Sequence, residues 1–359
     1  VCDGLVDALS RPYAGTWAWI RALAPDAPIL RERSQKSGGE AEERLRALAS
    51  AASSLLSPNE AESGAAFDDR GRVESLGGLP ISAEISVYRA PTDNDRGRGP
   101  VDYWGISSDD LGPLGTGTGQ WGVSHAQRWE MARLHLLRRA WHESSFEHGT
   151  RVLIERWAPP AAQFGLEARW TFTSVDGENE GASAGVALPG SRLLVKVEMT
   201  PYGEWPERIP RAGVRLRIPG TGWTASWVGE TDIAYTDIPG ANPDGFGHAE
   251  LEELWDVGVK PQEGGHRPGL KVLEQRGEER ALIIIPRSEM GWSASPWSER
   301  ELAQAAHWED LPKSNRTFVW LDAVQDGIGT RSCGPDARPE FGARMTARTM
   351  EFILCVTDL

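Results

Sequence analysis

The sequence predicts a mainly β protein, built as a large antiparallel β-sandwich with a short helical extension at its N-terminus. Three observations support this fold class. Short apolar runs alternate with polar residues, clusters of turn-forming residues separate these runs, and the 359 residues include 40 glycines, 24 prolines and 16 tryptophans. Many short strands with regular turns are typical of an antiparallel sandwich and not of a βαβ fold.

Residues 1–62 differ in character from the rest of the chain and are predicted to form a divergent, partly helical extension or linker. Leu45, Leu48 and Leu55 recur at helical spacing through an alanine-rich run. Two interpretations of this helix stay open: a surface helix in a weakly ordered tail, and an amphipathic helix that binds a partner. Residues 63–359 are predicted to form the sandwich domain.

Strands are expected where apolar and polar residues alternate, because such a strand has one face in the core and one face in water. The alternating runs are 81–87, 195–199, 214–218, 318–324 and 350–356. Residues 282–285 are instead continuously apolar. This run predicts a strand that is buried on both faces.

One helix is predicted within the sandwich domain. Ser298 and Glu301 have the spacing of a capping box, and Leu302 begins an apolar stripe behind it. His307 falls near the expected end of this helix, where the helix dipole favours a protonated imidazole. We interpret His307 as a structural histidine, with a functional role as the alternative.

The densest polar signal is the loop Arg89-Ala90-Pro91-Thr92-Asp93-Asn94-Asp95-Arg96-Gly97, which follows the strand at 81–87. Asp93, Asn94 and Asp95 carry the oxygen donors that a hard cation prefers. The alternative is that they cap turns and pair with Arg89 or Arg96. Two carboxylates so close in one loop do not suit the separations of ~5 Å or ~6.5–9.5 Å that glycoside hydrolysis needs. We therefore place no catalysis in this loop.

Composition excludes several classes of partner and site. A net charge of −14 and a pI near 5.1 argue against nucleic acid or an anionic membrane as partner. The three cysteines, Cys2, Cys333 and Cys355, form no CxxC pair and support neither a disulfide framework nor a zinc site.

No apolar run reaches the ~18 residues of a membrane helix, so we expect a cytoplasmic protein. Because the chain begins with Val, we expect it to be a fragment or a processed piece of a longer protein.

Further motifs follow the Arg89–Gly97 loop in a fixed order. They are Ile209-Pro210-Arg211-Ala212-Gly213-Val214, Pro261-Gln262-Glu263-Gly264-Gly265, Ser293-Ala294-Ser295-Pro296-Trp297-Ser298, and Gly327-Ile328-Gly329-Thr330 with Ser332-Cys333-Gly334-Pro335. From Phe67 to the C-terminus, this succession resembles the small chain, or C-terminal domain, of the large bacterial-type β-galactosidases of glycoside hydrolase family 2.

The resemblance implies a galactose-mutarotase-like supersandwich that packs against a catalytic (β/α)₈ barrel. In that family the barrel carries the two catalytic glutamates and the Mg and Na sites, so neither catalytic residues nor a metal site or cofactor is expected in this chain. The chain would support hydrolysis of terminal β-D-galactosides by completing the active-site wall and subunit contacts in an oligomer, and would be inactive alone. The alternative function is a stand-alone carbohydrate-binding or interaction sandwich.

The resemblance also implies roles for individual residues. Ser332, Cys333 and Arg331 are expected to bind substrate, although Cys333 stands where the best-known relative has a tryptophan that stacks on the sugar. Trp292, Trp297 and Trp308 are candidates for a replacement aromatic face. Seven residues of the family motifs are expected to have a structural role. They are Arg89, Asp93, Asn94, Asp95, Gln262, Glu263 and His307.

Overall fold

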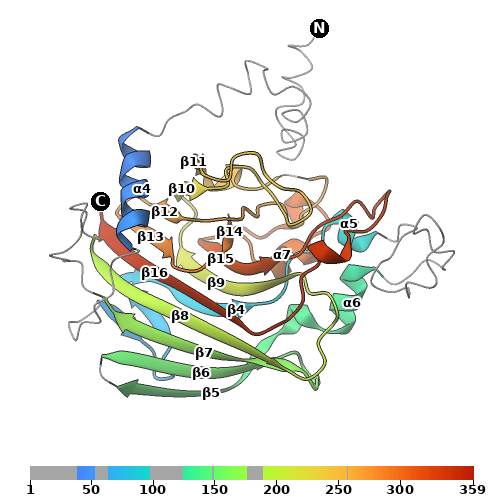
Figure 1. Cartoon of the computed structure of the whole chain (residues 1–359), viewed down its shortest axis with the longest axis horizontal. Helices are drawn as coiled ribbons and strands as arrows, with labels where there is room; N and C mark the ends of the chain where they lie inside the picture. The colour runs from blue at the N-terminus through green and yellow to red at the C-terminus, as the bar shows by residue number, and fades with distance from the viewer. Residues whose placement is uncertain (1–38, 53–63, 98–123, 148, 176–188, 257) are drawn as a thin grey trace, which may run out of the picture.

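The computed structural model describes residues 39–52, 64–97, 124–147, 149–175, 189–256 and 258–359, and in these ranges the strands form three antiparallel sheets (Figure 1). The largest sheet contains, in spatial order, β11 (Gly245–Glu250), β10 (Thr224–Gly229), β12 (Val272–Arg276), β13 (Arg280–Pro286), β16 (Arg348–Asp358), β8 (Ser191–Tyr202), β7 (Gly165–Ser174), β6 (Thr150–Ala158) and β5 (Arg138–Glu147). A second sheet contains β14 (Gly291–Ser295), β15 (Arg316–Gln325), β9 (Arg211–Pro219) and β4 (Ser82–Ser86). The third contains β1 (Ala65–Phe67), β2 (Val73–Leu76) and β3 (Leu79–Pro80).

Short helices cover the ends and one face of the sheets. The α-helices are α4 (Glu40–Ala52), α5 (Asp93–Arg96), α6 (His125–Met131) and α7 (Glu299–Gln304). Single 3₁₀ turns are η2 (Leu134–Leu136), η3 (Leu251–Glu253), η4 (Trp308–Asp310) and η5 (Pro339–Phe341). None of the helices in the described ranges is long and apolar enough to span a membrane.

The main core lies between the nine-stranded and the four-stranded sheets. Alternate residues of β8, including Val195 and Val197, pack in one cluster with alternate residues of β9, including Val214 and Leu216. Each strand keeps its intervening polar residues on the other face, as the alternation predicts. The predicted mainly β, antiparallel sandwich is confirmed.

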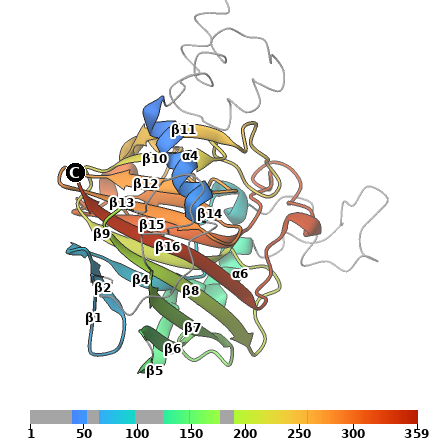
Figure 2. The ribbon, with the colours of Figure 1, turned by 60° about the vertical axis from the view of Figure 1, so that its left-hand side comes forward.

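Strand β13 is buried on both faces, which confirms the interpretation of residues 282–285. Leu282 belongs to the main core, whereas Ile283 packs on the opposite face with Leu45 and Leu48 of α4. Helix α4 lies beside β10, β12 and β13 (Figures 1 and 2). The apolar stripe of this helix is therefore covered by the chain's own sheet.

An ion pair adds to the docking of α4 on the sheet. An Arg44 guanidinium nitrogen donates to the carboxylate of Glu274 on β12 at 2.7 Å. Leu55, the last leucine of the predicted apolar stripe, lies outside the described residues. Of the two interpretations of this helix, the structure shows a helix on the surface of its own domain.

Helix α7 begins as predicted and ends earlier. The Ser298 hydroxyl accepts a hydrogen bond from the Glu301 amide (3.3 Å), and the Ser298 amide donates to the Glu301 carboxylate (2.8 Å). His307 lies three residues beyond the last helical residue, so the expected interaction with the dipole of this helix is wrong. The reason is local: the Asp310 carboxylate accepts from the His307 amide (2.9 Å) and starts η4 instead.

Replacing Leu45 tests the docking of α4. Leu45→Ala leaves a cavity between the helix and the sheet, so we expect it to lower the free energy of unfolding by about 2–5 kcal/mol. Glu43→Ala on the exposed side of the same helix is the control, with an expected change within ~0.5 kcal/mol. Urea unfolding followed by tryptophan fluorescence measures both, and equal effects of the two changes would contradict the docking.

Candidate functional site

Three loops that are distant in sequence meet at one corner of the sandwich. They are residues 87–97 after β4, residues 258–265, and residues 327–335 after β15; Figure 1 shows α5 beside the loop that follows β15. The Asn94 side chain joins the first loop to the third: its Nδ2 donates to the Gly329 carbonyl (2.6 Å), and its Oδ1 accepts from the Ser332 amide (3.2 Å) and hydroxyl (2.6 Å). Asn94 thus fixes the position of Ser332.

The 87–97 loop contains a helical turn, α5, where the sequence had suggested turn-capping side chains. Thr92 is the N-cap: its hydroxyl accepts from the Asp95 amide (3.1 Å), and the Asp95 carboxylate accepts from the Thr92 amide (2.8 Å). This is a capping box with aspartate in the third helical position. The Thr-x-x-Asp spacing is the sequence signal that could have located the turn.

A buried ion pair holds the same loop against the third one. Arg89 is 0% exposed and Asp95 is 1% exposed, with 2.7 Å between Nη2 and Oδ1. Arg89 also donates to the carbonyl oxygens of Asp326 (2.7 Å) and Gly327 (3.2 Å). The guanidinium therefore links the strand end, α5 and the start of the 327–335 loop.

Asp93 differs from Asp95 although the two stand in one motif. Its side chain is 52% exposed and lies 3.0 Å from the ammonium of Lys260. Its structural contribution comes from the backbone, because the Asp93 amide donates to Oε1 of Gln262 (2.7 Å). The carboxylates of the motif point to different partners, and among the described residues no group of three or more His, Cys, Asp or Glu is placed to hold a metal ion.

The 258–265 loop docks on the 87–97 loop through Gln262 and Glu263. In addition to the Gln262 bond, the Glu263 amide donates to the Ala90 carbonyl (3.1 Å). The Glu263 carboxylate accepts from the Gly265 amide (3.3 Å) and from Arg211 (3.4 Å). These bonds build the second wall of the corner.

A network of buried charges lies beneath the corner, and sequence reasoning missed it. Arg208 contacts the carboxylates of Asp326 (2.5 Å) and Asp336 (2.8 Å), and Asp336 also bonds His125 (2.6 Å). Burial raises the pKa of Asp326 to about 7, against the opposing charges of Arg208 and Arg89. No local motif could have signalled these contacts, because the two acids lie 118 and 128 residues from Arg208 in the sequence.

The residues predicted to bind substrate lie at different depths. Ser332 is exposed and lines a hollow in the corner. Cys333 is an exposed free thiol in the adjoining turn, where its amide donates to the Thr330 carbonyl (3.0 Å). Arg331 is 1% exposed, and its guanidinium lies 3.8 Å from Asp336, under the surface. Substrate contact by these three residues stays a prediction.

The candidate aromatic faces are also separated by the fold. Trp292 is buried in the core with its ring 5.2 Å from that of Trp227, so it offers no face to a ligand. Trp297 and Trp308 are partly exposed, with ring centroids 6.1 Å apart. The Trp308 indole donates to the Gly258 carbonyl (2.8 Å) and so supports the edge of the 258–265 loop.

The three loops, together with Asp256 and residues from 233–238, line a hollow of about 330 Å³. Its wall consists of Thr92, Asp93, Asn94, Ile233, Tyr235, Ile238, Asp256, Gly258, Gln262, Glu263, Gly264, Ile328 and Ser332. Two polar atoms of these wall residues, Oη of Tyr235 and Oδ1 of Asp256, are buried away from water and do not face the open space of the hollow.

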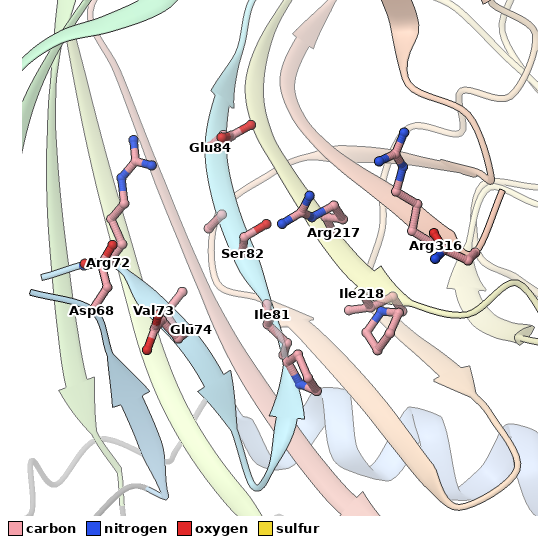
Figure 3. A pocket seen from close by; sticks show the side chains of 14 residues that line it. Asp68, Arg72, Val73, Glu74, Ile81, Ser82, Glu84, Arg217, Ile218 and Arg316 are labelled. Atoms are coloured by element: carbon pink, nitrogen blue, oxygen red, sulfur yellow. The ribbon is translucent and has the colours of Figure 1, made fainter. Parts of the chain in front are cut away.

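A second groove, of about 480 Å³, lies between β2 and the β4–β9 pair. Figure 3 shows Asp68 and Arg72 on one side of this groove and Glu84, Arg217 and Arg316 on the other. Several of its charges are already paired, Arg72 with Glu155, Glu84 with Arg215 and Arg316 with Glu301. No described residue that lines it has a buried polar atom without a partner. Because Ser332, one of the residues predicted to bind substrate, lines the hollow in the loop corner, that hollow is the better candidate site.

Comparison with known proteins identifies the relatives of this chain. The family model described as Beta galactosidase small chain matches residues 62–354. A beta-galactosidase of Arthrobacter sp. (strain B7) is 31% identical over 303 residues, which are 80% of this chain and 28% of the relative. A beta-galactosidase of Actinobacillus pleuropneumoniae is 22% identical over 75% of this chain and 23% of its own length. The chain thus spans about a quarter of these relatives.

Among solved structures, a putative aldose 1-epimerase of Escherichia coli K12 aligns with 80% of this chain and 93% of its own length, at 12% identity and a TM-score of 0.33. An alpha-galactosidase of Lactobacillus brevis aligns with 62% of this chain and 27% of its own length, at 8% identity and a TM-score of 0.31.

Matched changes at the two aspartates of the 87–97 loop test its construction. Asp95→Asn leaves the buried Arg89 guanidinium without its counter-charge, so we expect a loss of about 3–5 kcal/mol in the free energy of unfolding. Asp93→Asn removes only a surface pair with Lys260, with an expected loss of about 0–1 kcal/mol. Urea denaturation of the two variants makes the comparison; if Asp93→Asn proved the more damaging change, this assignment would be wrong.

The stability of the chain should depend on pH through Asp256. Burial raises the pKa of Asp256 to about 6, whereas the unfolded value is about 3.9. The stability contributed by this group is present below pH ~4 and is lost as the pH rises through about 6, because the unfolded chain releases the proton first. Asp256→Asn should therefore gain stability over the unmodified chain across this window, by about 1 kcal/mol after allowance for solvent screening.

Thermal melts at pH 4, 5, 6 and 7 measure this difference. A constant offset between Asp256→Asn and the unmodified chain at all four values would show that Asp256 has an ordinary pKa.

Proposed function

Because the chain belongs to the beta galactosidase small chain family, we propose that it serves the hydrolysis of terminal β-D-galactosides as the non-barrel part of a larger enzyme. Its relatives are about four times longer than the matched region. In the proposed enzyme, a catalytic part therefore performs the chemical steps and this chain has a supporting role. The catalytic part supplies two carboxylates about 5 Å apart for a retaining reaction, together with the metal sites. This chain supplies a wall of the active site.

The observation that carries this proposal is the Asn94 clamp on Ser332. The clamp holds the exposed Ser332–Cys333 edge against α5, and α5 is anchored by the buried Arg89–Asp95 pair. A wall held by buried charges keeps its shape when substrate binds, so little binding energy is lost in ordering it. Membership of this family does not favour the alternative of a stand-alone sugar-binding sandwich.

In this mechanism the residues of the chain position and enclose the substrate. The Ser332 hydroxyl donates to Asn94, so its lone pairs are left to accept from a sugar hydroxyl at the edge of the wall. The 258–265 loop closes the adjacent side and, with the catalytic part, shields the reacting groups from bulk water while the one water molecule that hydrolysis consumes still enters. Contacts of the same surface with the catalytic part, and between subunits, complete the proposed assembly.

Reconstitution tests the division of labour. The purified chain should not hydrolyse lactose, and the catalytic part should gain activity when the chain is added, with a complex visible by analytical ultracentrifugation. Lactose hydrolysis by the chain alone, or a catalytic part whose activity is unchanged by the chain, would overturn the proposal.

Replacing Asn94 in the reconstituted enzyme tests whether the clamp on Ser332 contributes to catalysis. Asn94→Ala removes three hydrogen bonds to the 327–335 loop, and we expect kcat/KM for lactose to fall about tenfold while the complex still assembles, because a misplaced wall loses orientation. Asn315→Ala, in the second groove, is the matched control and should leave kcat/KM unchanged. A loss of assembly together with activity in Asn94→Ala would assign the residue to docking instead.

A further inference from the structure

We propose that strand β5 is a contact between two copies of this chain. The two β5 strands pair antiparallel around Ser144 and join the two nine-stranded sheets into one continuous sheet. The partner at this edge is thus a second copy and not the catalytic part. The inference does not depend on the proposed function, because it uses only β5 and the residues beside it.

Strand β5 has a free edge. It is the last strand of the nine-stranded sheet and forms the lower border of that sheet in Figures 1 and 2. Among the described residues it pairs with β6 alone, and no other backbone group bonds to it. The N–H and C=O groups on the far side of β5 therefore have no strand partner. Such a row of groups is a template for one further strand.

The side chains of β5 are exposed on both faces. Every residue from Trp141 to Phe146 is exposed, and no residue of β5 belongs to a core cluster of the described chain. The neighbouring strand β6, by contrast, places Leu153 and Trp157 in the main core. Antiparallel strands usually have one covered face. Trp141 is 44% exposed and Phe146 is 63% exposed, and aromatic side chains of this kind are enriched in protein interfaces.

The sequence of β5 is complementary to itself. Residues that stand opposite one another in an antiparallel pair share a face of the sheet, and like charges in that position are destabilising. Pairing around Ser144 places Glu143 opposite Ser145 on one face. On the other face it places His142 opposite Phe146, which forms two aromatic cross-strand pairs. Pairing around Glu143 would instead bring two copies of this carboxylate together.

The length of the regular part of β5 favours the same register. A β-bulge between Arg139 and Trp141 interrupts the ladder with β6, so the regular part of β5 is residues 141–147. Ser144 is the middle of this stretch, and pairing around it uses the whole stretch. Pairing around His142 or Ser145 would shorten the paired length and lose backbone hydrogen bonds.

The two exposed rings are held in place by arginines. The Arg156 guanidinium lies 5.5 Å from the centre of the Trp141 ring. The Arg151 guanidinium lies 5.4 Å from the Phe146 ring and 4.6 Å from the ring of Phe67, which packs against the main core. These cation–π contacts order the aromatic side chains before a partner binds. Ordering them in advance lowers the entropic cost of association.

The position of β5 separates this contact from the loop corner. In Figure 1 the strand points away from α6 and from α5, which lies beside the loop that follows β15. The catalytic part is proposed to meet the Ser332–Cys333 edge, which the Asn94 clamp holds against α5. A second copy at β5 therefore leaves that wall open for the catalytic part.

Disulfide cross-linking tests the register. Opposite residues have Cα atoms ~4.5–5.5 Å apart, within the span of a disulfide, whereas diagonal neighbours are ~7–8 Å apart. The background carries Cys2→Ser and Cys333→Ser, and Cys355 is buried. In this background Ser144→Cys should give a disulfide-linked dimer on mild oxidation. Ser145→Cys is the matched control, because its two copies stand diagonally and should stay unlinked.

Sedimentation equilibrium of the 359-residue chain measures the association itself. We expect a reversible dimer in a concentration series that reaches the millimolar range. Ser144→Lys places two ammonium groups opposite each other and should raise the dimer Kd at least about tenfold. Thr200→Lys adds the same charge at an exposed position of β8 in the same sheet and should leave the Kd unchanged. Thermal melts confirm that each variant is folded.

The outcomes separate this inference from the proposed function. A chain that stays monomeric throughout the series would overturn the contact, as would a dimer whose Kd is the same in Ser144→Lys. Cross-linking by Ser145→Cys and not by Ser144→Cys would contradict the register. If Ser144→Lys weakens binding of the catalytic part and the chain alone is monomeric, the catalytic part occupies the edge and the inference is wrong. A dimer weakened by Ser144→Lys, in a chain that adds no activity to the catalytic part, supports the contact and removes only the proposed function.

Discussion

The corner of this molecule depends on one buried ion pair, between Arg89 and Asp95. Taking a guanidinium out of water is costly, and Arg89 keeps its charge because Asp95 and Asp326 raise its pKa against the effect of burial. Its remaining donors reach the carbonyl oxygens of residues 326 and 327, and its planar group lies 5.5 Å from the centre of the Trp129 ring. A charge with so many required partners permits only one arrangement of the loops around it.

The same constraint extends below the loops and explains their rigidity. Asp326 is shared, since its carbonyl oxygen accepts from Arg89 and its carboxylate pairs with Arg208. Arg208 in turn reaches Asp336 and the carbonyl oxygen of Gly327. Breaking any one pair would leave a buried charge uncompensated, so the network favours a single geometry of the 327–335 loop. The exposed Ser332–Cys333 edge lies above this network. Residues from four separate segments of the chain therefore fix the position of that edge.

Sequence patterns predicted the strands well because each strand obeys a local rule. Alternation placed β8 and β9, and a continuous apolar run placed β13 with both faces buried. What α4 packs against could not be predicted, because its partners Ile283 and Ile285 lie more than two hundred residues away. The sequence grouped Asp93 with Asp95, and only the fold shows that one is at the surface and the other is buried.

Asp256 lines the hollow, and Asp326 belongs to the network of buried charges beneath it. The two carboxyl groups differ in the charges that surround them. Burial raises the pKa of both carboxyl groups, to about 6 and about 7. For Asp326 the guanidinium groups of Arg208 and Arg89 oppose that effect without cancelling it. For Asp256 burial is the cause of the shift, and one of its oxygens has no partner among the described residues. The carboxyl group with the larger shift is therefore the one that supports the 327–335 loop, and a raised pKa alone does not separate a group placed for a ligand from a group placed for structure.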